Sequence, residues 1–117
     1  KSNPSLAALT LLNDPAFVEA ARSLAEILVR ENGSNIERVE RAFRRATSRA
    51  PTAAETAELL DVYNESARYY GAHPEAARKT LATGDSPIDQ KLPPVEWAAW
   101  TNVARTILNL AETTTRS

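Results

Sequence analysis

The stretch PAFVEAARSLAEILVRENG, residues 15–33, decides the fold class of this chain. Asp14 precedes it as a candidate N-cap, and Pro15 fits the first position of a helix. Gly33 is expected to end the helix, because glycine tolerates the left-handed backbone found there. The apolar side chains recur at the three- and four-residue spacing of one helix face; they are Phe17, Ala20, Ala21, Leu24, Ile27 and Leu28. The stretch therefore predicts an amphipathic α-helix.

Two further helices begin at sequence motifs that cap helix starts. Residues 34–37 (SNIE) and 52–55 (TAAE) have capping-box spacing, in which the side chains of the first and last residues each accept a hydrogen bond from the other's backbone amide. The first of these helices is expected to stop at Pro51 and the second at about Tyr70. Their predicted buried faces are Ile36, Val39, Phe43 and Ala46, and then Leu59, Leu60, Val62, Tyr63 and Ala67.

The remaining segments also favour helices and loops over strands. We expect short helices over residues 4–12 and 74–84, an irregular loop over residues 85–94, and a frayed tail over residues 113–117. A final helix should start at Pro94, with an apolar face of Trp97, Trp100, Ala104, Ile107, Leu108 and Ala111. The predicted fold is all-α: a compact bundle of four main helices plus a short N-terminal helix, with all 117 residues in a single domain.

Composition excludes several classes of function. Fourteen basic and fifteen acidic side chains give a formal net charge of −1, whereas nucleic-acid modules usually carry a basic excess. The chain has no cysteine, so it offers no thiolate metal ligand, disulfide or covalent haem attachment. The longest apolar run, residues 6–12, is far shorter than the roughly 18 residues that span a bilayer. We therefore expect neither a nucleic-acid partner nor membrane insertion.

Arginines form the most distinctive surface pattern. Arg38, Arg41, Arg45 and Arg49 are expected on one face of the helix that follows residue 34, with Arg44 at its border. Guanidinium groups bind phosphates and carboxylates through paired hydrogen bonds, so this face is a candidate interaction surface. The alternative is a solvated face, partly paired with acidic side chains of the next helix; these are Glu55, Glu58, Asp61 and Glu65.

Other candidate sites are weaker. His73 is the only histidine, and a zinc site needs three or four protein ligands, so no metal or cofactor is expected and His73 fits a helix start. No G-x-S-x-G motif exposes a serine nucleophile, so no catalytic residue is assigned. Trp97 and Trp100 lie three residues apart and could line a ligand groove, although such residues are more often core anchors.

Several stretches, in this order, resemble a known family: Leu11-Leu12-Asn13-Asp14-Pro15, Phe17 to Arg22, Arg49-Ala50-Pro51-Thr52 with Glu55, and Trp100 with Leu108-Asn109-Leu110 and Glu112. Together they resemble the C-terminal portion of the domain-of-unknown-function family 1553, large planctomycete-type proteins associated with cytochrome c domains. The resemblance implies an exported, multi-domain parent and a periplasmic or otherwise extracytoplasmic location. It implies no transferable activity.

These observations lead to two hypotheses of different classes. In the first, the chain is a C-terminal fragment, since it begins at Lys1, and a non-enzymatic module that docks onto other domains of its parent. It should then leave apolar surface uncovered, at residues 6–12 and near Trp97. In the second, the chain is an accessory part of an active site in a cytochrome-linked redox or polysaccharide-processing enzyme. The arginine stripe or the tryptophan pair would then supply binding residues.

Overall fold

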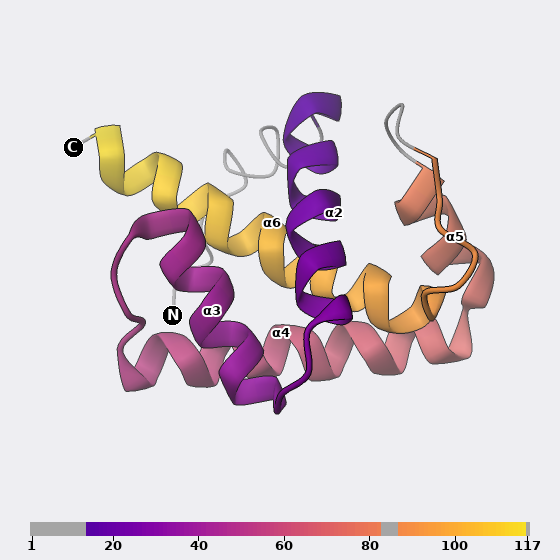
Figure 1. Ribbon diagram of the computed structural model, residues 1–117, viewed down its shortest axis with the longest axis horizontal. Helices are drawn as coiled ribbons and strands as arrows, with labels where there is room; N and C mark the ends of the chain where they lie inside the picture. The colour runs from indigo at the N-terminus through magenta and orange to yellow at the C-terminus, as the bar shows by residue number, and fades with distance from the viewer. Residues whose placement is uncertain (1–13, 83–86, 117) are drawn as a thin grey trace.

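The computed structural model describes residues 14–82 and 87–116, and within these ranges it contains five helices and no strand (Figure 1). The helices are α2 (Pro15–Arg30), α3 (Asn35–Thr47), α4 (Ala53–Ala72), α5 (Pro74–Ala82) and α6 (Pro94–Arg116). The all-α prediction is confirmed. The short helix expected over residues 4–12 lies outside the described residues.

The predicted helix starts are also confirmed. The Asp14 carboxylate accepts hydrogen bonds from the backbone amides of Ala16 (2.9 Å) and Phe17 (3.4 Å), and Pro15 follows at the first helical position. Both capping boxes form, at residues 34–37 and 52–55. In each, the hydroxyl of the first residue and the carboxylate of the last accept a hydrogen bond from the other residue's backbone amide. Local hydrogen bonding therefore sets where α2, α3 and α4 begin.

The helix ends in the structure differ from the predicted ones. Helix α2 ends at Arg30, so Gly33 lies in the α2–α3 connection, with φ of +148°. Helix α3 ends at Thr47, where Ser48 takes the left-handed conformation that stops a helix before Pro51 is reached. Helix α4 continues through Gly71, and α6 runs to Arg116 through the segment that was expected to fray.

The core is built around α6, which packs against each of the other four helices. Figure 1 shows α6 through the middle of the molecule, with α2 crossing it and α4 running below it. The side chains that α6 buries include both tryptophans and a run of small and branched residues: Trp97, Ala98, Ala99, Trp100, Thr101, Val103, Ala104 and Ile107. Because alanine lets helices approach closely, an Ala-rich central helix can hold several neighbours at once.

Three residues of the predicted apolar faces are exposed, namely Ala20 and two isoleucines. Ile36 on α3 is 51% exposed and Ile27 on α2 is 39% exposed. Val39 and Phe43, later members of the α3 stripe, are fully buried, so the described chain covers only part of that stripe. No helix of the described residues is long and apolar enough to cross a membrane.

Candidate functional site

Three members of the arginine stripe turn toward the α2–α3 connection. Arg38 donates a hydrogen bond to the backbone carbonyl of Glu31 (3.0 Å), and Arg41 donates to that of Asn32 (2.9 Å). Arg45 pairs with the Glu31 carboxylate at 2.8 Å, and Arg41 lies 3.7 Å from its other oxygen. These carbonyls follow the end of α2, where the helix dipole favours positive charge. The three guanidinium groups therefore clamp the connection from α3, and we call this set the α3 clamp.

Gly33 makes the close approach of the clamp possible. A Cβ atom at this position would lie 2.8 Å from the Glu37 carboxylate and 3.0 and 3.1 Å from the two terminal nitrogens of Arg41. These separations are shorter than van der Waals contact. The φ of +148° is also a backbone region that is essentially restricted to glycine. Glycine is thus required here for the clamp and not for ending α2.

Arg49 lies beyond the end of α3 and makes a separate contact. Its two terminal nitrogens donate to the two carboxylate oxygens of Glu55, each at 3.0 Å, and its guanidinium carbon lies 4.7 Å from the centre of the Phe43 ring. The hydrogen bonds from Arg49, followed by that from the Thr52 amide, lower the pKa of Glu55 from 4.5 to about 2. The expected pairing with an acidic residue of the next helix is thus confirmed for Arg49, whereas the α3 clamp contacts the α2–α3 connection.

Trp97 and Trp100 lie in the core, with exposed fractions of 1% and 0%. The Trp97 indole N–H donates to the Arg22 carbonyl at 3.1 Å, and the Trp100 ring stacks on Tyr63 with 4.4 Å between centroids. Both rings are therefore buried in the core, and Trp97 also contributes to the lining of a groove with Ile88 and Leu92. Because Ile88 is 36% exposed there, uncovered apolar surface near Trp97 stays a prediction.

Arg22 is a buried charge that sequence reasoning passed over. Its side chain is 2% exposed, donates to the carbonyl of Leu81 in the last turn of α5, and lies 5.9 Å from the Trp97 ring centre. A cation at a helix C-terminus is favoured by the helix dipole and by its free carbonyls. Arg22 lies four residues after Val18 and three before Ala25, on the face of α2 that is buried, whereas the predicted stripe did not include it. That spacing was the available signal.

A second group that the sequence did not reveal joins α4, α5 and α6. The Tyr70 hydroxyl shares a hydrogen bond with the Thr80 hydroxyl (2.9 Å) and accepts one from the Asn102 amide (3.2 Å), which also donates to the Ser66 hydroxyl (3.1 Å). These residues are far apart in sequence, so no spacing could have linked them. Each member has a partner within the group, so the network stabilises the packing of the three helices against one another.

The single histidine stands at the junction of α4 and α5. Its ring centre lies 4.5 Å from that of Tyr69, and its backbone carbonyl accepts a hydrogen bond from the Ala76 amide (2.9 Å) at the start of α5. The helix-start interpretation of His73 is thus confirmed. Among residues 14–82 and 87–116, no group of three His, Cys, Asp or Glu side chains could hold a metal ion.

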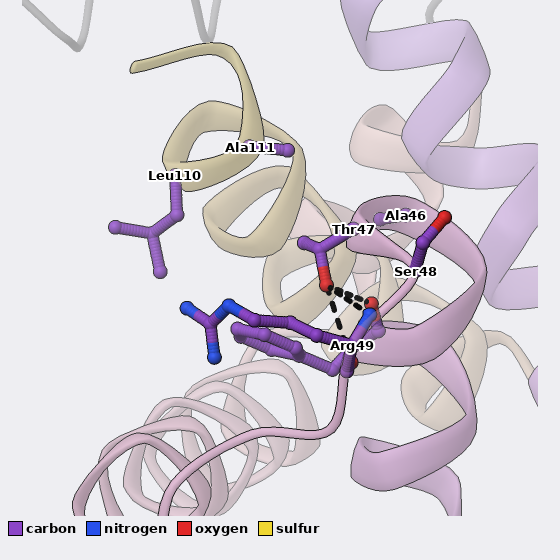
Figure 2. Close-up of a pocket in the computed structure, with 7 residues that line it drawn as sticks. Ala46, Thr47, Ser48, Arg49, Leu110 and Ala111 are labelled. Atoms are coloured by element: carbon purple, nitrogen blue, oxygen red, sulfur yellow. Dashed lines mark hydrogen bonds between the residues drawn. The ribbon is translucent and has the colours of Figure 1, made fainter. Parts of the chain in front are cut away.

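The surface of the described residues includes a groove at each end of α6. One, of about 300 Å³, lies between the end of α3 and the second half of α6 (Figure 2), and its lining is Phe43, Ala46, Thr47, Ser48, Arg49, Leu110 and Ala111. We call it the α3–α6 groove. The other, of about 220 Å³, lies beside the start of α6, with Ile88, Leu92 and Trp97 among its lining residues. The α3–α6 groove has a mixed lining that includes the hydroxyl groups of Thr47 and Ser48 and the side chain of Arg49, whereas the second groove is mostly apolar. Neither lining brings together a nucleophile and a base.

A comparison with models of known protein families shows which family the chain belongs to. Residues 1–63 match the model of a family described as a protein of unknown function, DUF1553. No curated protein and no solved structure matches the chain. The match covers more than half of the 117 residues, including α2, α3 and the first half of α4. The chain therefore belongs to the DUF1553 family.

Proposed function

We propose that this chain is a structural module without activity of its own, which docks onto other domains of a larger protein. The side chains best suited to bind a ligand are instead engaged in contacts that stabilise the fold. The α3 clamp contacts the α2–α3 connection, Arg49 pairs with Glu55, and the tryptophans fill the core. The alternative role, an accessory part of an active site, would require these side chains to face a ligand.

The apolar stripe of α3 carries the proposal. Val39 and Phe43 are buried, yet Ile36, which continues the stripe toward the start of α3, is 51% exposed. The exposed side of Ile36 is the apolar area that a partner would cover in this proposal. Covering the exposed half of an isoleucine side chain stabilises a complex by about 1 kcal/mol.

The nature of the parent protein is also a proposal. The resemblance supports a planctomycete-type, exported protein with a cytochrome-c-like region, which would place this chain in the periplasm or outside the cell. The other domains of that protein are then the docking partners. Cell fractionation of the source organism tests the location: recovery of the parent protein in the cytoplasmic fraction alone would overturn it.

Isothermal titration calorimetry of the chain against the remainder of its parent tests docking. We expect association with a negative heat-capacity change, which marks burial of apolar surface. Ile36→Ser should weaken it about fivefold, the equivalent of about 1 kcal/mol. Ile88→Ser, at a half-exposed site beside the start of α6, is the matched control and should have no such effect. No association, or equal weakening by both variants, would contradict the proposed surface.

A further inference from the structure

The α2–α3 connection contains the one Asn-Gly pair of the sequence, Asn32-Gly33. An asparagine side chain can react with the backbone that follows it, when the nitrogen of the next residue attacks the side-chain amide carbon. A glycine in that next position favours the attack, because it has no Cβ atom to obstruct the approach and restricts the backbone least. The pair is therefore a candidate modification site, and the contacts around it decide whether it reacts.

The groups that would react are free in the folded chain. Asn32 and Gly33 are exposed and lie between the end of α2 and the start of α3. Among the described residues, neither the Asn32 side-chain amide nor the Gly33 N–H has a hydrogen-bond partner. Asn64 provides the contrast, because it lies inside α4 and the N–H of the next residue is held by the helix. Attack at Asn32 therefore breaks no hydrogen bond of the fold, whereas attack at Asn64 does.

Arg41 acts on the peptide bond that has to react. Its guanidinium donates to the Asn32 backbone carbonyl (2.9 Å), and a Cβ atom on Gly33 would lie 3.0 and 3.1 Å from its two terminal nitrogens. A charged donor on a peptide carbonyl draws electrons from the attached nitrogen, so it favours loss of the Gly33 proton. The other two guanidinium groups of the α3 clamp add positive charge beside it. The clamp therefore stabilises the negative charge that develops during the attack.

The reaction needs only water as a co-reactant. The Gly33 nitrogen loses its proton to solvent and forms a bond to the side-chain carbon of Asn32. The bond from that carbon to the side-chain nitrogen breaks, and ammonia leaves after taking a proton from solvent, so a five-membered succinimide ring remains. One water then adds to either ring carbonyl and opens the ring. The product is aspartate or isoaspartate at position 32, with one ammonia released.

We propose that Asn32 is a site of spontaneous deamidation in the folded chain, left open by the free Gly33 N–H and promoted by Arg41. The reaction adds one negative charge beside the three guanidinium groups of the α3 clamp. In the isoaspartate product the main chain also becomes one methylene longer, which changes the geometry of the α2–α3 connection. The inference concerns the chemistry of one connection and does not depend on the proposed function.

Peptide mapping by mass spectrometry tests the proposal on the full chain, incubated at mildly alkaline pH with and without urea. Each modified site is identified by the mass change from amide to acid, and chromatography separates aspartate from isoaspartate. We expect modification at Asn32 in the folded chain at a rate that equals or exceeds the rate in urea. Asn64 in the folded chain is the internal control and should stay unmodified. A folded chain that protects Asn32, or that modifies Asn32 and Asn64 equally, would overturn the proposal.

A pair of variants tests the contribution of Arg41. Arg41→Gln should slow the reaction of the folded chain about tenfold, the equivalent of about 1.4 kcal/mol, and leave the rate in urea unchanged. Arg44→Gln removes the same charge from an exposed position of α3 outside the clamp, and should change the rate less than about twofold. A faster reaction in Arg41→Gln would show that the clamp protects Asn32, and equal slowing by both variants would show an effect of net charge alone. Either result would overturn the role of Arg41.

Discussion

Replacing Gly33 by alanine tests whether the α3 clamp holds the α2–α3 connection. The new Cβ would stand 2.8 Å from the Glu37 carboxylate and 3.0 Å from the nearest Arg41 nitrogen. Both groups are hydrogen-bonded: Glu37 to the Ser34 amide at 2.8 Å and Arg41 to the Asn32 carbonyl at 2.9 Å. Relief of the contact therefore requires one of these hydrogen bonds to lengthen or break.

The magnitude follows from two contributions. A non-glycine residue forced into this region of positive φ costs about 1–3 kcal/mol. Disturbing a partly exposed hydrogen bond adds about 0.5–1 kcal/mol. We therefore expect Gly33→Ala to lower the free energy of unfolding by about 1.5–4 kcal/mol, with a fall in Tm of about 6–16 °C for a domain of this size.

The matched control is Gly71→Ala. A Cβ at position 71 meets no atom within 4 Å, and Gly71 lies inside α4, so alanine should raise stability by up to about 1 kcal/mol. Urea unfolding followed by circular dichroism measures both variants. If Gly33→Ala is neutral, or if both variants shift stability in the same direction, the clamp does not constrain the connection as described.

Two further predictions concern the charged pair and the tryptophans. Arg49 and the Thr52 amide hold the pKa of Glu55 near 2 in the folded state, against an ordinary value of 4.5. A lowered pKa adds stability that is present above pH 4.5 and is lost as the pH falls toward 2. The Tm of the native chain should therefore fall over this pH range, and Glu55→Gln should make that fall smaller. A fall of the same size in the variant would contradict this. Trp97→Phe should lower the free energy of unfolding in urea by about 1 kcal/mol more than Trp100→Phe does. The reason is that the Trp97 N–H donates a hydrogen bond to a carbonyl, whereas the buried Trp100 N–H has no acceptor among the described residues. Equal costs would refute that distinction.

The helix starts and the main core residues could be predicted because their causes are local. A capping box needs only four consecutive residues, and a buried helix face repeats every three or four positions. The Asp14 cap, the two capping boxes and the burial of Trp97 and Trp100 all depend on such short-range patterns. The same reasoning gave the all-α fold class.

The use of the arginine stripe could not be predicted, because it depends on which helix end lies beside α3. Sequence places the guanidinium groups on one face but does not say that the chain bends back at residues 31–34 and offers Glu31 to them. The exposure of Ile36 has the same origin. The spacing assigns it to an apolar face, whereas its burial depends on whether another element lies over it.

The family match ends at residue 63, within α4, although the structure does not divide there. The apolar face of α2, inside the match, is buried chiefly against α6, which begins at Pro94 outside it, and α3 packs against α6 as well as against α2 and α4. The Trp97 N–H and the Leu81 carbonyl both bond to Arg22 from beyond residue 63. Residues 64–117 therefore supply the partner surface that the matched segment needs for folding. We therefore expect residues 1–63, expressed without α6, to leave the apolar face of α2 exposed.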